Sequence, residues 1–268
     1  MDTALKATGW LRATTAIIRC NNNKHIKGAV LRYVQMGLGK IIVVVDGQKD
    51  LGATIGFISD VIDLKKVKQV QILTMNTGYS WANALNLGIK AIQLHNVKAR
   101  MLNEPQIRHI FNVSVEANFN DVHVIEMLHQ LNLYSDVGVV GTSFEGKLDG
   151  NYFNLGPSYR HPRNTGMMIR LDALAAMYGT FDARCDAYGG MEDIDFILGL
   201  IALTGMRYLM LDMKVPLVVG KFYHQPDKQA REEKAMDNII TDWLGHFQKN
   251  SEEYCRIEAV IDEMGLRK

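Results

Sequence analysis

Three carboxylates fall within four residues in the stretch GGMEDIDF, Gly189 to Phe196. Glu192, Asp193 and Asp195 head an apolar run with helical spacing, which places them in the first turn of a helix. Carboxylates there can complement the helix dipole and its free N–H groups. Held within reach of a hydroxyl group, a carboxylate can instead act as a general base. Asp195 lies two residues beyond Asp193 and should point away from it, which favours a capping or supporting role.

The elements before this motif alternate between strand and helix. We expect strands at residues 14–20, 40–45, 67–75, 109–115 and 137–141, and helices at 24–36, 53–64, 80–94 and 121–131. Such alternation predicts an α/β fold, with a mainly parallel central sheet flanked by helices on both faces.

The pattern is less regular after residue 141. Residues 142–163 are rich in Gly, Asn, Tyr and Pro, and we expect a loop or an irregular hairpin there. A strand at 165–169, helices at 171–177 and 194–204, and strands at 207–211 and 215–219 follow. Residues 227–265 are mostly helical by pattern, so the chain should end in a helical extension.

The composition of the chain excludes few classes of protein. The 268 residues are 47% hydrophobic and carry a formal net charge of +1, so bulk charge favours neither a nucleic-acid binder nor a membrane-surface protein. Three widely spaced cysteines suit a reducing compartment, and the longest apolar runs are only strand-sized. We therefore expect a soluble cytoplasmic protein with no transmembrane segment.

Polar residues follow four of the predicted strands. Cys20 to Asn22, Asp46, Asn76, and Glu116 with Asn118 stand at these ends. Any one of them could be an ordinary turn residue, but in open α/β sheets ligands bind outside the carboxyl ends of the strands. The sequence contains neither a G-x-G-x-x-G after the first strand nor a P-loop, so a phosphate would need another holder, such as a divalent metal.

Four segments resemble the glycosyltransferases of the GT-A fold, in particular the family 2 type with a galactosyltransferase-type C-terminal region. They are TTAIIRCNNN, KIIVVVDGQKD, GYSWANALNLGI, which is similar to a Gly-x-x-x-Ala-x-Asn helix start, and RNTGMMIRLDALAAMYGTFDARCDAYGGMEDIDFILGLIALTG. The resemblance covers about residues 14–224. It implies one GT-A domain at 1–226, with a nucleotide-binding half at about 14–120 and an acceptor-binding half at about 121–226, before a helical extension at 227–268.

The resemblance implies transfer of a sugar from a nucleotide-diphosphate sugar donor to an acceptor hydroxyl, with inversion. Asp193 would be the general base, and Glu192 would bind sugar hydroxyls. The residues implied at the donor nucleotide are Cys20, Asn21, Asp46, Asn76 and Asn83.

Members of the family bind Mn²⁺ or Mg²⁺ through an Asp-x-Asp motif, where this chain has Glu116-x-Asn118. The change removes one formal charge and should weaken cation binding. His224 matches a position where many metal-dependent members place a ligand. Arg160 and Arg163 could neutralise the leaving diphosphate.

Two other functions stay open. One is a sugar nucleotidyltransferase, which would ordinarily carry a Gly-rich basic loop after the first strand. The other is a catalytically degenerate module that binds a saccharide or a partner. The acceptor could be a saccharide, a lipid, a protein or a modified nucleic-acid base, and the C-terminal helices could pack back on the domain or form a homodimer contact.

Overall fold

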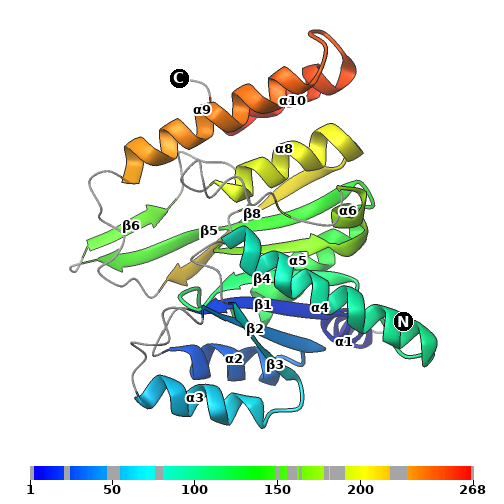
Figure 1. The fold of residues 1–268 in the computed structure, drawn as a ribbon, viewed down its shortest axis with the longest axis vertical. Helices are drawn as coiled ribbons and strands as arrows, with labels where there is room; N and C mark the ends of the chain where they lie inside the picture. The colour runs from blue at the N-terminus through cyan, green and yellow to red at the C-terminus, as the bar shows by residue number, and fades with distance from the viewer. Residues whose placement is uncertain are drawn as a thin grey trace.

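The computed structural model describes residues 3–20, 25–46, 55–75, 81–148, 151–155, 162, 165–177, 181, 191–217 and 228–266. Its centre is an eight-stranded sheet with the order β3-β2-β1-β4-β7-β5-β6, in which β8 also pairs with β5 (Figure 1). Helices lie on both faces. The expected α/β fold with a mainly parallel sheet is confirmed.

The first half of the sheet is parallel throughout. It consists of β3 (Val70–Met75), β2 (Lys40–Asp46), β1 (Thr14–Cys20) and β4 (His109–Ser114). The helices α2 (Ile26–Gln35), α3 (Ile55–Lys65) and α4 (Trp81–Met101) connect these strands. Every residue of β1 is buried, as expected for an aliphatic strand covered on both faces.

The second half mixes strand directions. β7 (Gly166–Arg170) runs antiparallel between β4 and β5 (Val137–Leu148), and β6 (Asn151–Leu155) forms an antiparallel pair with β5. β5 is longer than expected, so part of the segment predicted as a loop or hairpin is a strand pair. The strands expected at 207–211 and 215–219 form one strand, β8 (Arg207–Leu217), because a register shift after Thr142 absorbs the polar interruption.

Two apolar cores cover the two faces of the sheet. One holds side chains from α1 (Thr3–Arg12), α2, α3 and α5 (Asp121–Leu133). The other holds side chains from α4, α6 (Leu171–Ala176), α8 (Glu192–Thr204), α9 (Lys228–His246) and α10 (Glu252–Met264). β1 contributes alternately, with Ile17 in the second core and Ile18 in the first.

The C-terminal helices α9 and α10 lie over α8 in Figure 1. Ala235, Ile239, Ile257 and Ile261 are all buried in the core they share with α8. Burial of these apolar side chains fastens the C-terminal helices to the sheet through α8. In the part of the chain described, no helix is both long and apolar enough to cross a bilayer.

Candidate functional site

Strand direction brings the carboxyl ends of several strands to one edge of the sheet. β1, β2, β3 and β4 run parallel, and β5 and β8 run in the same direction because β7 is antiparallel to both β4 and β5. The short connection from α8 to β8 places the start of α8 at the end where these strands finish. The first turns of α4 and α8 therefore meet the carboxyl ends of the strands, where ligands bind in open α/β sheets.

The acidic motif begins α8 in an unusual backbone conformation. Met191 precedes the helix with φ 74° and ψ 28°, a left-handed conformation uncommon for a residue other than glycine. Glu192 and Asp193 are only 4% and 9% exposed, and Asp193 Oδ1 accepts a hydrogen bond from the Ile194 N–H at 3.0 Å. Two buried carboxylates thus directly follow a residue with a strained backbone. Such strain is often found at functional sites.

Asp195 has a different neighbour. Its Oδ1 accepts a hydrogen bond of 2.8 Å from Trp243 Nε1 on α9. Gly199, one turn further along α8, leaves room for the same indole, because a Cβ there would lie 3.0 Å from Trp243 Cζ2. Asp195 therefore fastens the C-terminal helix to α8, in keeping with a supporting role.

Phe181 joins the two halves of the candidate site. The Asn86 side chain of α4 donates to the Phe181 carbonyl at 2.9 Å and accepts from its N–H at 2.7 Å. The Phe181 ring stacks on Phe196 of α8, with ring centroids 4.5 Å apart. Phe181, which lies in the fourth of the segments that resemble the GT-A family, is thus held from both helices.

Asn86 was not predicted from the sequence, which had singled out Asn83 one turn earlier on α4. Both side chains are half-buried. The available signals were the Ala-x-Asn of the quoted helix start, which in this sequence ends on Asn86, and the position of a polar residue between Leu85 and Ile89 on the buried side of the helix. That periodicity indicates a buried partner, but it cannot name Phe181, which lies 95 residues away.

The end of β1 presents different chemistry on its two faces. Cys20 is fully buried in the core beneath α2. Arg19 points to the opposite face, where its guanidinium lies 4.9 Å from the centre of the Trp81 ring at the start of α4. Arg19 is only 6% exposed. This cation was missed in the sequence, although a charged residue inside the apolar run AIIRC was the signal.

The turn after β4 carries the predicted metal ligands. The Glu116 N–H donates to Ser114 Oγ at 3.3 Å, and the Asn118 N–H donates to the Pro216 carbonyl at 2.8 Å. Ala117 also forms an isolated antiparallel bridge with Leu217, the last residue of β8. The turn is thereby fixed against the end of β8.

The donor set of this turn suits a weakly held divalent cation. Glu116 is half-buried and offers a carboxylate, while the exposed Asn118 offers an amide oxygen. Mg²⁺ is usually held by one or two carboxylates together with substrate phosphates, so this pair is sufficient only if a ligand completes the set. Across the residues whose placement is described, no group of three or more His, Cys, Asp or Glu side chains could hold a metal ion.

Several predicted site residues lie outside the described part of the chain. They are Asn21, Asn76, Arg160, Arg163 and His224. Asp46 ends β2, but its side chain is also outside the description. The structure therefore places the start of α8, Phe181, Asn86, the end of β1 and the turn at Glu116 at the same edge of the sheet. The roles of all the predicted site residues stay predictions.

This sheet order, with helices on both faces and an acidic helix start at the carboxyl edge, defines the GT-A fold. The chain is similar to a mannosyltransferase from Pyrobaculum calidifontis, solved with GDP-Man and Mn²⁺, with a TM-score of 0.62 and 12% identity over 94% of this chain and 69% of the other. It is also similar to GalNAc-T7, solved with UDP, GalNAc and Mn²⁺, with a TM-score of 0.53 and 9% identity over 94% of this chain.

The chain spans 54% of the GalNAc-T7 chain, so about half of that protein has no counterpart here. No protein-family model matches the sequence, and no curated protein matches it either. At these identities the likeness establishes that the chain has the GT-A fold, as the sequence predicted.

Proposed function

We propose that this protein is an inverting glycosyltransferase that uses a nucleotide-diphosphate sugar as donor and an acceptor hydroxyl as nucleophile. The observation that carries the proposal is the buried Glu192–Asp193 pair at the start of α8, linked through Phe181 to Asn86 on α4. A GT-A fold alone would support many functions, whereas this link joins the acidic motif to the donor-side helix.

Asp193 is the proposed general base. It would take the proton from the acceptor hydroxyl while that oxygen forms a bond to the anomeric carbon of the donor. The bond from the anomeric carbon to the diphosphate oxygen breaks at the same time, and the nucleoside diphosphate leaves with the bonding electrons. Glu192, the buried neighbour of Asp193, would bind sugar hydroxyls.

The donor would lie across the ends of β1, β2 and β4. Trp81 and the Arg19 guanidinium stacked on it provide an aromatic and a cationic group at the end of β1. Glu116 and Asn118 would hold a Mn²⁺ or Mg²⁺ ion, which would offset the negative charge of the diphosphate. The neighbours solved with GDP-Man and with UDP and GalNAc support a nucleotide-linked hexose as the donor class.

Replacement of Asp193 tests the assignment of the base. Asp193→Asn preserves the size of the side chain and should keep the fold and donor binding, while turnover falls by about 10²-fold or more. Asp195→Asn is the matched control on the same helix, because Asp195 bonds to Trp243 rather than to a substrate. A near-normal turnover in Asp193→Asn would reject Asp193 as the base.

Metal titration of Glu116→Ala tests the cation site. The variant loses the one carboxylate of the Glu116-x-Asn118 pair, so it should need more Mn²⁺ for the same activity or lose activity. An unchanged titration curve would show that the turn after β4 does not hold the cation.

A further inference from the structure

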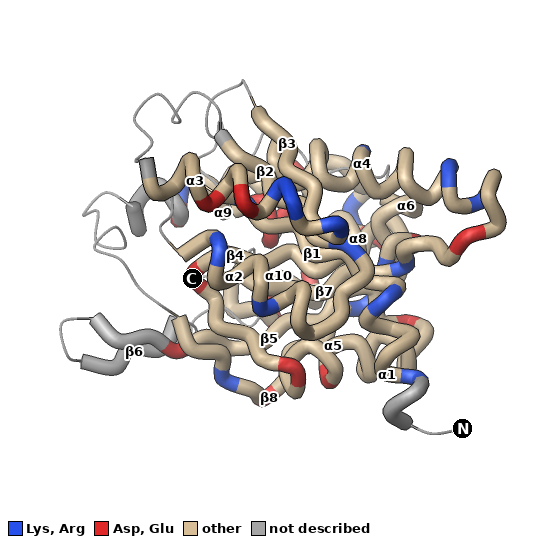
Figure 2. Tube along the Cα trace, turned by 90° about the horizontal axis from the view of Figure 1, so that it is seen from below, with Lys and Arg blue, Asp and Glu red and all other residues tan. Residues whose placement is uncertain are grey.

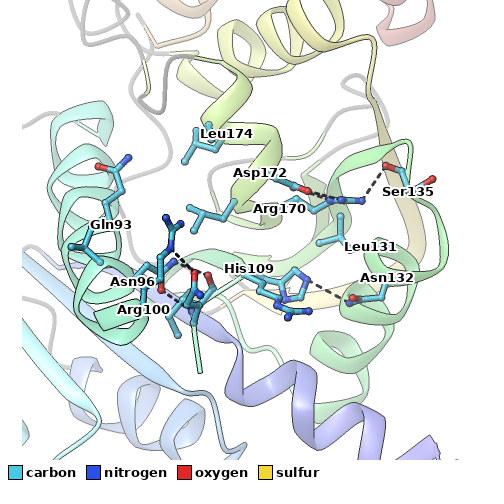
Figure 3. Close-up of a pocket in the computed structure, with 16 residues that line it drawn as sticks. Gln93, Asn96, Arg100, His109, Leu131, Asn132, Ser135, Arg170, Asp172 and Leu174 are labelled. Atoms are coloured by element: carbon cyan, nitrogen blue, oxygen red, sulfur yellow. Dashed lines mark hydrogen bonds and ion pairs between the residues drawn. The ribbon is translucent and has the colours of Figure 1, made fainter. Parts of the chain in front are cut away.

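A cavity of about 870 Å³ lies at the opposite edge of the sheet from the candidate active site. Its walls come from the C-terminal half of α4, residues 106–109, the end of α5 and the junction of β7 with α6 (Figure 3). His109 begins β4 and Arg170 ends the antiparallel β7, so both mark the amino edge. The length of β4 separates them from the turn at Glu116 by roughly 17 Å.

Hydrogen bonds fix the walls of this cavity. The Asn96 side chain donates to the Ile107 carbonyl and accepts from its N–H, both at 2.8 Å. Arg170 makes two bonds to the Asp172 carboxylate, at 2.9 and 2.6 Å, and a third to the Ser135 carbonyl at 3.0 Å. A site with such walls is largely formed before a ligand arrives, as small-molecule sites usually are.

The cavity has an excess of positive charge. Arg100, Arg108 and Arg170 line it, and Asp172 is the only carboxylate among the described lining residues. Arg170 is paired with Asp172, and Arg100 uses its Nε for a bond to Gln106. Figure 2 shows the basic segments near the end of α4.

Arg108 and Arg100 have donors left to offer. Arg108 is exposed, and within the described residues no acceptor or carboxylate is paired with its guanidinium group. The bond from Arg100 to Gln106 uses only Nε, so the two terminal nitrogens of Arg100 take no part in it. Guanidinium groups present paired N–H donors that match the geometry of phosphate and carboxylate oxygens.

His109 lines the same cavity and is 5% exposed. Burial first, and then the charges of Arg170 and Arg108, lower the pKa of His109 to about 4. Its Nδ1 has no hydrogen-bond partner among the described residues, and its Nε2 lies 3.5 Å from Asn132 Nδ2. A neutral imidazole adds no charge of its own, so Asp172 is the one carboxylate among the described lining residues that offsets the three arginines.

We propose that this cavity is a second binding site, separate from the glycosyl-transfer site, for a phosphorylated small molecule whose phosphate oxygens bind Arg100 and Arg108. The volume lies within the range of small-molecule sites. The exposed amide side chains of Gln93 and Gln106 can bind polar groups on the rest of the ligand. The proposal does not depend on the proposed function.

Binding of inorganic pyrophosphate, followed by NMR of the His109 ring, tests the proposal. Saturable binding should shift the His109 signals and raise its pKa, because the anion offsets the charges of the two arginines. Arg100→Gln with Arg108→Gln should weaken this binding by about tenfold or more. Lys90→Gln with Lys98→Gln is the matched control, since it removes two charges from exposed positions on α4 that do not line the cavity.

Three results would overturn the proposal. One is the absence of a saturable change at His109. Another is equal affinity in the arginine and lysine double variants, which would mean that pyrophosphate binds elsewhere, for example at the donor site. The third is equal affinity for citrate, which would show a general polyanion surface rather than a phosphate site. None of these results bears on donor turnover.

Discussion

The two hydrogen bonds between Asn86 and Phe181 predict a specific double effect of Asn86→Ala on stability and on activity. Each bond contributes about 1 kcal/mol net, and a buried backbone group left unpaired costs about 1–3 kcal/mol. Phe181 is 4% exposed, so water cannot easily replace the lost partner. We expect the free energy of unfolding to fall by about 2–4 kcal/mol.

The chain offers a matched control at Asn96. Its side chain makes the same pair of bonds to a backbone, at 2.8 Å each to Ile107, but at the opposite edge of the sheet. Asn96→Ala should therefore lose a similar free energy of unfolding. Only Asn86→Ala should also lower turnover, by about tenfold or more, because it releases Phe181, whose ring stacks on Phe196 of the acidic helix.

Urea unfolding followed by circular dichroism measures the loss of stability. Donor turnover, measured under conditions in which each variant is fully folded, separates the effect on activity from it. Asn86→Asp provides a milder variant, since it keeps the acceptor for the Phe181 N–H and loses the donor to its carbonyl. Normal turnover in Asn86→Ala, or an equal loss of turnover in Asn96→Ala, would refute the role given to the Asn86–Phe181 link.

Two further predictions concern stability. Trp243→Phe removes the hydrogen bond to the Asp195 carboxylate and should lower the free energy of unfolding by about 1.5–3 kcal/mol, measured by urea unfolding; no loss would show that the bond does not fasten α9. The pKa of His109 is lowered from 6.5 to about 4. Between these two values the imidazole is protonated in the unfolded chain and neutral in the folded chain. The His109 contribution is fully present above pH 6.5 and decreases by about 3 kcal/mol as the pH falls towards 4. His109→Gln should flatten that part of the stability–pH curve, and an unchanged slope would contradict the assignment.

The sequence predicted the parallel half of the sheet well because local pattern and burial agree there. The run at 14–20 matches β1 residue for residue, and the run at 40–45 matches β2 within one residue. Both strands are covered on two faces, so an unbroken aliphatic run is the pattern that their environment requires.

Longer-range contacts explain what the sequence pattern did not predict. α4 continues to Met101 instead of ending near residue 94, because Asn96 and Ala99 are buried against elements that no local pattern shows. The sequence pattern predicted two strands where the structure has only β8. The interruption of the pattern at residues 212 and 213 falls at a register shift against β5, so the strand continues through it. The helix α1 was not predicted, since its short amphipathic pattern is weak.

The candidate site was predictable in part for the same reason. The motif at Glu192 and Asp193 stands out because the two carboxylates and the apolar run that follows are adjacent in the chain. Asn86 and Arg19 were missed because each acts through a residue distant in sequence, Phe181 and Trp81 respectively. The cavity at the amino edge draws on four separate segments and leaves no contiguous motif.

The most direct test of the central claim is donor turnover by the whole chain. UDP-, GDP- and ADP-sugars are incubated with the protein and Mn²⁺, and the nucleoside diphosphate released and the melting temperature are measured. We expect that at least one donor is cleaved and stabilises the protein, and that Asp193→Asn keeps the stabilisation while cleavage falls. Stabilisation without cleavage would indicate a degenerate sugar-nucleotide binder. In a parallel incubation with a nucleoside triphosphate and a sugar 1-phosphate, release of pyrophosphate would indicate a nucleotidyltransferase. If every donor stays intact and no nucleotide raises the melting temperature, the proposed glycosyltransferase function is contradicted.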